Sequence, residues 1–133
     1  MIGFTCGAFD LLHAGHVIMF AECKSYCDYL IVGLQIDPTV RVGKNKPIES
    51  VFERFLKLRA VKYIDEIIPY ETEKELGILL ALLHGKYGKN FIRFIDETYK
   101  KKYGFMELPV KVHFNSRKHP YSSTALREKI KHA

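Results

Sequence analysis

One segment of the chain, residues 29–36, is apolar along almost its whole length (YLIVGLQI) and rich in β-branched side chains. A strand with one solvated face alternates apolar and polar positions, whereas a strand buried on both faces is a continuous apolar run. Strands of the second kind lie in parallel sheets that helices cover on both sides. The segment therefore predicts an α/β fold, and it is far shorter than the ~18 apolar residues that indicate a membrane span.

The rest of the chain alternates between short β-rich runs and longer helical segments. Ser50 with Glu53, and Thr72 with Glu75, have the spacing of a capping box that starts a helix. The expected strands are 2–6, 29–36, 66–69, 91–95 and 110–114, and the expected helices are 16–27, 50–62, 72–84 and a last one from Ser122 or Ser123 to residue 130. Strands that alternate with helices form βαβ units, so we predict a Rossmann-like five-stranded parallel sheet with helices on both faces. No linker, repeat or low-complexity tract divides the chain, and we expect a single domain over residues 1–133.

Charge and cysteine content narrow the class of protein. The 133 residues include 21 Lys and Arg against 15 Asp and Glu, and the net charge of +6 suits an anionic partner, either a nucleic acid or a small phosphorylated substrate. Cys6, Cys23 and Cys27 are too few for a disulfide scaffold, and the last two have no matching Cys or His pair for a zinc site. The N-terminus does not resemble a signal peptide, so we expect a soluble cytoplasmic protein without a membrane span.

The turn between the first strand and the first helix, residues 7–16 (GAFDLLHAGH), is the most informative segment for function. In an open α/β sheet the ligand crevice lies at the carboxyl ends of the strands, where this turn must lie. Gly7 lets the chain leave the strand tightly, and Gly15 lets a ligand or a neighbouring segment approach closely. His13 and His16 share one side of the first helical turn, where free backbone N–H groups and the helix dipole favour anions. The turn therefore predicts a phosphate site.

These residues resemble the G-x-F-D-x-x-H-x-G-H signature of the HxGH nucleotidyltransferases, and within that group the chain is most similar to the small cytidylyltransferases of the glycerol-3-phosphate type. The resemblance continues along essentially the whole chain and implies the nucleotidyltransferase fold. Its further points are Lys44 and Lys46 after the second strand, residues 62–68 (KYIDEII), which resemble the family's R-Y-V-D-E-V-I, and Arg117 with residues 121–124 (YSST), which resemble R-T-E-G-I-S-T-T.

The resemblance implies transfer of CMP from CTP to a small phosphorylated acceptor similar to glycerol 3-phosphate, with release of pyrophosphate. It implies that His13 and His16 are catalytic donors to the triphosphate, and that Lys44 or Lys46 is a mobile cation over the phosphates. A phosphate monoester with a second pKa of ~6 is largely dianionic at pH 7, so the acceptor needs no general base. The expected cofactor is Mg²⁺, carried by the triphosphate rather than by a protein metal site.

The resemblance also implies a set of nucleotide-binding residues. Arg117 and the helix start at 122–124 would hold the β- and γ-phosphates, and Asp10 would orient the acceptor or a histidine. The base would lie between the backbone of 6–8 and the segment 117–121. Lys62 stands where the family has an arginine, and Ile95 where it has a glycine. The full set is Cys6, Gly7, Ala8, Phe9, Asp10, Gly15, Lys62, Asp96, Arg117, Tyr121, Ser122, Ser123 and Thr124.

Two other interpretations stay open. Residues 37–41 (DPTVR) and 46–48 (KPI) also resemble a loop of the heptose-phosphate adenylyltransferases, which implies ATP as the donor and a sugar phosphate as the acceptor. The other alternative is a nucleotide-binding or nucleic-acid-binding module without catalysis. The chain has no aromatic-rich RNA-reading motif, so we expect no nucleic-acid partner, and the presence of both histidines favours an enzyme. The two loop lysines also fit a solvated loop, and Ser122 or Ser123 a simple helix cap.

The predicted helix 72–84 carries more apolar residues than one buried face needs. Ile78 and Leu82 lie beyond the core stripe. Most soluble homo-oligomers are two-fold dimers, so we expect a homodimer. The stripe itself consists of Leu76, Leu79, Leu80 and Leu83.

Overall fold

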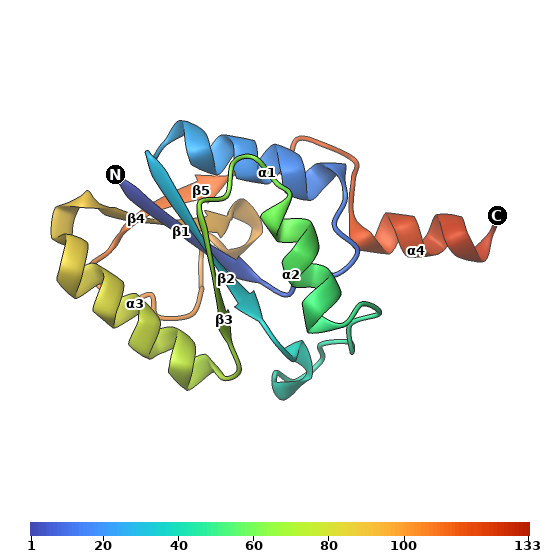
Figure 1. The fold of residues 1–133 in the computed structure, drawn as a ribbon, viewed down its shortest axis with the longest axis horizontal. Coiled ribbons are helices and arrows are strands. Elements are labelled where there is room, and N and C mark those ends of the chain that lie inside the picture. Colours follow the sequence, from blue (N-terminus) through green and yellow to red (C-terminus); the bar gives the residue numbers. More distant parts are fainter.

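Five parallel strands form one sheet in the order β3-β2-β1-β4-β5 in the computed structural model, which describes residues 1–133 (Figure 1). This confirms the predicted sheet. β2 lies on one side of β1 and β4 on the other, so the strand order reverses beside β1, and this is where open α/β sheets bind ligands. The strands are β1 (Ile2–Gly7), β2 (Tyr29–Gln35), β3 (Glu66–Tyr70), β4 (Phe91–Asp96) and β5 (Lys111–Asn115).

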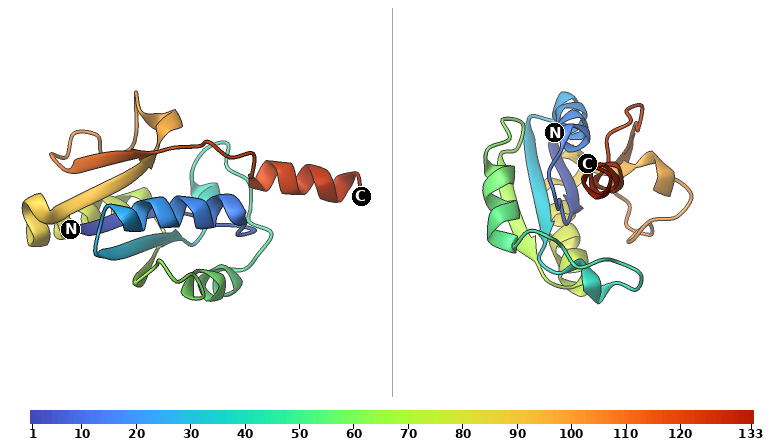
Figure 2. Two further views of the ribbon diagram at one scale, coloured as in Figure 1. Left: turned by 90° about the horizontal axis from the view of Figure 1, so that it is seen from above. Right: turned by 90° about the vertical axis from the view of Figure 1, so that its right-hand side faces the viewer.

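Helices cover both faces of the sheet, as Figures 1 and 2 show. The covering helices are α1 (Ala14–Ser25), α2 (Val51–Arg59) and α3 (Glu73–Tyr87), and a fourth helix, α4 (Ser123–Lys131), follows the last strand. Alternate residues of β2 pack against different helices, since Leu30 and Val32 contact the layer of α1 and α2 whereas Ile31 contacts α3. The continuous apolar run 29–36 thus has the predicted cause. None of the helices combines the length and the apolar character needed to cross a membrane.

Most helix boundaries follow local capping. Ser50 and Glu53 form the predicted reciprocal capping box at the start of α2. The box predicted at Thr72 and Glu75 forms only by half, because the Glu75 carboxylate accepts a hydrogen bond from the backbone of Glu71 instead of Thr72. α2 ends at Arg59, three residues before its predicted end.

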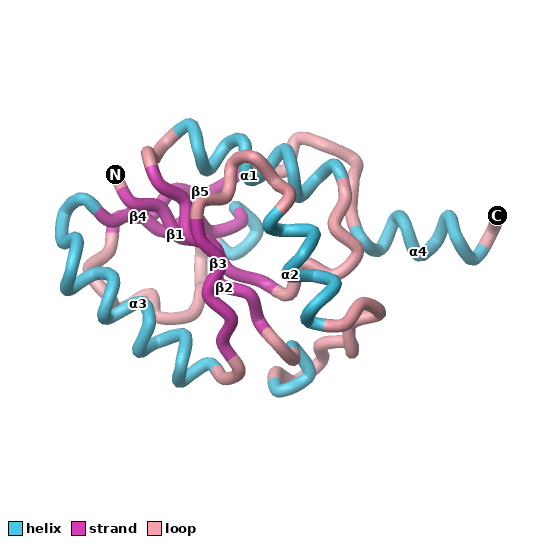
Figure 3. The backbone as a smooth tube through the Cα atoms, in the orientation of Figure 1, coloured by secondary structure: helices cyan, strands magenta, loops and turns pink.

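α4 extends away from the body of the molecule, which is evident along the backbone trace (Figure 3) and from two further directions (Figure 2). None of its residues is buried. Its first two turns are tied to the β1–α1 turn, where Ser123 Oγ donates to the Asp10 carbonyl at 3.2 Å and Arg127 Nη2 donates to the Asp10 carboxylate at 2.9 Å. The start of α4 is therefore fixed beside α1, while its end lies free of the domain.

The outer face of α3 leaves Ile78 and Leu82 exposed, at 53% and 67%. Leu76, Leu80 and Leu83 are buried against the sheet, as the helical spacing predicts. The homodimer stays a prediction.

A buried arginine of α2 joins the ends of two strands. Arg54 is 2% exposed, and its guanidinium donates to the carbonyls of Gln35 at 2.7 Å, Ile36 at 2.6 Å and Ala8 at 3.0 Å. Its Nε donates to the Glu49 carbonyl at 3.2 Å. Carbonyls at a strand end have no ladder partner, and buried polar groups without partners are costly. Arg54 therefore stabilises the edge of the sheet on which the turn 7–16 is built.

Arg54→Met should lower the free energy of unfolding by roughly 3 kcal/mol or more, because it leaves several buried carbonyls without donors. Arg59→Met removes the same charge from an exposed position of the same helix and should change stability by less than ~0.5 kcal/mol. Urea unfolding followed by circular dichroism measures both values. Equal unfolding midpoints for the two variants would contradict the role given to Arg54.

Candidate active site

The two histidines of the turn cap the helix that they start. His13 is the N-cap residue of α1, and its Nδ1 accepts a hydrogen bond from the Gly15 backbone N–H at 3.0 Å. His16 Nδ1 accepts from the His13 backbone N–H at 3.1 Å, which completes a reciprocal capping box. Because each Nδ1 is an acceptor, we assign the ring proton to Nε2 in both histidines. Each ring is left with one N–H donor for a ligand.

The surroundings keep both rings neutral. Burial is the largest cause that lowers the pKa of His16 to about 4, and electrostatic interactions with His13, His119 and Arg117 contribute in the same direction. Burial, followed by His119 and Arg117, also lowers the pKa of His13 below 6.5. At pH 7 both imidazoles are therefore neutral Nε2–H donors, suited to bind anionic oxygens rather than to deliver a proton.

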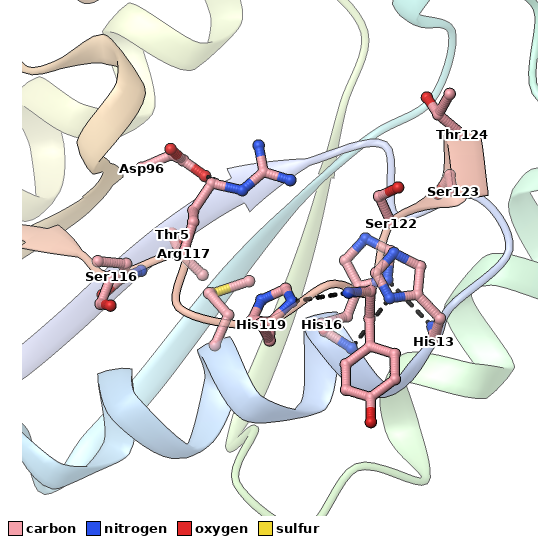
Figure 4. Close-up of a pocket in the computed structure, with 14 residues that line it drawn as sticks. Thr5, His13, His16, Asp96, Ser116, Arg117, His119, Ser122, Ser123 and Thr124 are labelled. Carbon is pink, nitrogen blue, oxygen red and sulfur yellow. Dashed lines mark hydrogen bonds and ion pairs between the residues drawn. The ribbon is translucent and has the colours of Figure 1, made fainter. Parts of the chain in front are cut away.

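Both histidines line a cavity of about 360 Å³ at the carboxyl ends of β1 and β4 (Figure 4). The structure brings nine of the predicted site residues to this cavity: His13, His16, Gly15, Asp96, Arg117, Tyr121, Ser122, Ser123 and Thr124. Five lining residues were not predicted: Thr5, Met19, Asn115, Ser116 and His119. Asn115 and Ser116 directly follow the predicted fifth strand, so the rule that ligands bind at carboxyl ends could have found them.

Arg117 and the start of α4 line this cavity together with the two histidines. Arg117 Nε lies 3.4 Å from Asp96 Oδ2 at the end of β4, and the Arg117 backbone donates to Glu97 at 3.2 Å. Ser122 caps α4 by accepting from the Ala125 N–H at 3.0 Å. Free backbone N–H groups at a helix N-terminus favour the binding of an anion, and this helix start lines the cavity.

Gly15 allows the segment before α4 to pack directly on α1. A Cβ atom at this position would lie 2.6 Å from His119 Cε1 and 2.9 Å from the Tyr121 carbonyl oxygen. A larger residue would push the segment 116–121 away from the histidines. The predicted need for close approach at Gly15 therefore has a specific cause, which is contact with another part of the chain.

Asp10 has a different environment from the one predicted. Its carboxylate accepts from the backbone N–H groups of Ile48 and Glu49, each at 2.9 Å, and from Arg127. No histidine is among its hydrogen-bond partners, and it does not line the cavity. Asp10 instead joins the turn 7–16 to the loop before α2 and to α4.

Four more predicted residues lie outside this cavity. Cys6 and Gly7 line a second cavity on the α3 side of the sheet, and burial raises the pKa of the Cys6 thiol. Phe9 is buried, and its ring packs on His16 with 5.7 Å between ring centroids. Ala8 contributes its carbonyl to Arg54. These four residues support the turn, and the base pocket predicted along 6–8 does not form in the first cavity.

The predicted lysines all lie apart from the cavity. Lys44 and Lys46 are exposed in the loop between β2 and α2, whose later part is held by Asp10. Lys62 is exposed between α2 and β3, with its Nζ 5.2 Å from the centroid of the Tyr63 ring. Because β3 begins at Glu66, Lys62 lies at the amino edge of the sheet, opposite the cavity. The structure thus corrects the nucleotide-binding prediction for Lys62.

The lowered pKa of His16 predicts a pH dependence of stability. The unfolded chain binds a proton near 6.5 and the folded chain only near 4, so His16 makes stability fall as the pH falls through this window. His16→Gln keeps a side chain suited to the capping box and should remove up to about 3 kcal/mol of that pH dependence. Urea unfolding between pH 7 and pH 4 measures the difference.

The matched control is His132→Gln, in the exposed last residues of the chain, which should follow the wild-type curve. If the wild-type and His16→Gln stability curves run parallel over this range, His16 does not have the lowered pKa.

Comparison with known proteins places the chain in a family. Residues 4–129 match the family described as cytidylyltransferase-like. Two curated relatives carry the name "Bifunctional protein HldE": the one from Mesorhizobium japonicum is 38% identical over 84 residues, and the one from Rhodospirillum rubrum 37% identical over 84 residues. Each match covers 62% of this chain and 17% of the relative, so this chain corresponds to a small part of those proteins.

The fold is also similar to a solved structure, a lipopolysaccharide core biosynthesis protein from Thermoplasma volcanium. The TM-score is 0.66 at 24% sequence identity, over 87% of this chain and 96% of that one, which supports the assignment of the fold. With the family match over almost its whole length, the chain belongs to the cytidylyltransferase-like family of nucleotidyltransferases.

Proposed function

We propose that the protein transfers a nucleoside monophosphate from a nucleoside triphosphate to a small phosphorylated acceptor and releases pyrophosphate. The observation that carries this proposal is the histidine capping box, which directs two neutral N–H donors to a cavity that also contains Arg117 and the start of α4. Neutral donors, a guanidinium and helix N–H groups together suit a polyphosphate.

The chemistry requires no proton transfer. An oxygen of the acceptor phosphate forms a bond to the α-phosphorus, and the bond from that phosphorus to the bridging oxygen breaks, so that its electron pair leaves with pyrophosphate. The acceptor phosphate is largely dianionic at pH 7, since its second pKa is ~6. A histidine with a pKa of about 4 is a poor base at this pH, which fits a reaction that needs none. His13 and His16 donate hydrogen bonds as charge develops on the phosphate oxygens.

The remaining charge is balanced by fixed and mobile cations. Arg117 and the start of α4 hold the β- and γ-phosphates, and Lys44 or Lys46 approaches as the loop moves. Asp96 is the one carboxylate that lines the cavity, and it is already paired with Arg117. This donor set fits Mg²⁺ that enters on the triphosphate and keeps water and phosphate ligands, as is usual for this ion.

Two donor nucleotides are candidates. CTP is the first, because the family is described as cytidylyltransferase-like and the small cytosine ring suits a cavity shared with three phosphates. ATP with a sugar phosphate acceptor is the second, because residues 37–41 and 46–48 resemble the adenylyltransferase loop. The second cavity, at about 570 Å³, is also larger than a three-carbon acceptor needs.

His16→Ala and His13→Ala should each lower turnover by a factor on the order of 10² to 10³, the usual effect of losing one donor to a developing charge. Pyrophosphate release measures turnover. His132→Ala, near the exposed end of the chain, should keep wild-type turnover. Near-wild-type rates for both capping-box variants would remove these residues from the mechanism.

A melting assay with CTP, ATP, GTP and UTP, each with Mg²⁺, tests the choice of base. A ligand that binds only the folded state raises its stability by about 2.7 kcal/mol at 100 times Kd. The phosphates are common to all four, so differences report the base. We expect the largest rise with CTP; a larger rise with ATP would favour the adenylyltransferase, and no rise with any nucleotide would contradict the proposed function.

A further inference from the structure

The second cavity adjoins the first at the carboxyl ends of the same strands. Thr5 in the second half of β1 and Asp96 at the end of β4 line both cavities. The second cavity lies on the α3 face of the sheet, between the start of α3 and the segment 99–105. We call it the Arg93 cavity after the buried β4 residue in its wall. A molecule in it would lie beside the triphosphate site without overlapping it.

Arg93 is a buried charge with little compensation from the chain. Its side chain is 4% exposed, and only Nη1 makes hydrogen bonds, to the carbonyls of Gly104 at 3.0 Å and Phe105 at 3.4 Å. None of the ion pairs in the protein includes it. Burial lowers its pKa, and Cys6, Tyr103 and the exposed Glu107 oppose this effect. The Arg93 guanidinium carbon also lies 5.5 Å from the centroid of the Tyr103 ring, a contact that does not replace a counter-charge. Buried charges in proteins are ordinarily paired, so Arg93 is an exception with a cavity beside it.

Arg54 provides an internal comparison. It is buried to the same degree, but its Nε and both terminal nitrogens donate to four carbonyls, and it lines neither of the two cavities. The carboxylates of Asp10, Glu49 and Asp37 also act on its charge. All three guanidinium nitrogens of Arg54 thus donate within the fold, whereas Nε and Nη2 of Arg93 are left for another partner.

We propose that the Arg93 cavity binds the phosphorylated acceptor and that the Arg93 guanidinium binds its phosphate group. The proposal rests on the proposed function, since it places the acceptor beside the nucleotide. Lys102 adds positive charge at the same cavity, and Arg41 also lines it, with its Nε 3.8 Å from the Glu73 carboxylate. A guanidinium with free N–H groups binds a phosphate in a fixed geometry, which a lysine does not.

The rest of the cavity fits an acceptor with hydroxyl groups. Gln35, Tyr70 and Glu73 supply amide, phenol and carboxylate groups to its wall. Its volume of about 570 Å³ lies within the range of ~300–1,000 Å³ for pockets that enclose drug-sized ligands. The acceptor that fits is a phosphorylated polyhydroxy compound larger than glycerol phosphate.

Inorganic phosphate is the probe for this site, with binding measured by the shift of the melting midpoint and by ¹H–¹⁵N spectra of the arginine side chains. Arg93→Met should raise the apparent Kd of phosphate at least tenfold, the scale of one charge-assisted hydrogen bond. Arg59→Met makes the same charge change on the exposed face of α2 and should leave the Kd unchanged. Arg117→Met, which alters the first cavity, should retain the Arg93-dependent binding.

Two readouts keep the test independent of folding and of the nucleotide reaction. In the wild type, the Nε–H signal of Arg93, identified by its loss in Arg93→Lys, should shift on phosphate addition while that of Arg59 does not. Arg93→Met should keep the rise in melting midpoint caused by the triphosphate. The proposal would be overturned if Arg93→Met had the wild-type Kd for phosphate, or if Arg59→Met raised that Kd as much as Arg93→Met. It would also be overturned if the Nε–H signal of Arg93 did not shift on phosphate addition. If triphosphate did not raise the melting midpoint of the wild type, the proposed function would be contradicted instead.

Discussion

The buried guanidinium of Arg54 is the constraint on which the ligand-binding edge of this protein depends. Parallel strands end with carbonyls that have no partner in the ladder, and here the ends of β1 and β2 lie under a turn, a loop and the start of α2. One planar side chain with several donors satisfies these carbonyls together. These hydrogen bonds join the end of β1, from which the histidine turn starts, to the end of β2.

The same local interactions that start α1 also determine what its histidines can do. A serine or aspartate would cap this helix as well as His13 does, and a glutamate is the common partner three residues later. Histidines in both positions accept the same backbone N–H groups but retain an Nε2–H, so the helix start becomes a pair of donors. Burial then holds the pKa of His16 at about 4 and keeps the pair uncharged. The hydrogen bonds that cap the helix therefore also determine which ring nitrogen of each histidine carries the donor proton.

The sequence predicted the features that depend on neighbouring residues. The apolar run 29–36 and the alternation of elements were sufficient to predict the sheet. The turn 7–16 indicated the candidate site, and three of its residues, His13, Gly15 and His16, line the first cavity. The sequence was less informative about the surroundings of a residue when the residues that it contacts are distant along the chain. Arg54 and Arg93 look like solvated charges within a helix and a strand, and only the fold shows that both are buried. Lys62 was misplaced for the same reason, because a family motif does not show at which edge of the sheet it lies.

The two buried arginines also show why a folded chain retains a charge at a cost to its stability. Replacing a buried ion pair by apolar side chains is often neutral or stabilising, so a buried charge that is retained needs a reason in folding or in binding. Arg54 would leave four carbonyls unsatisfied if it were replaced, so folding alone explains its presence. Arg93 donates to two carbonyls through a single nitrogen, so fewer hydrogen bonds offset a similar desolvation cost. Because an anion that enters its cavity would supply the missing counter-charge, the cost of burying Arg93 in the free protein would be recovered as affinity on binding.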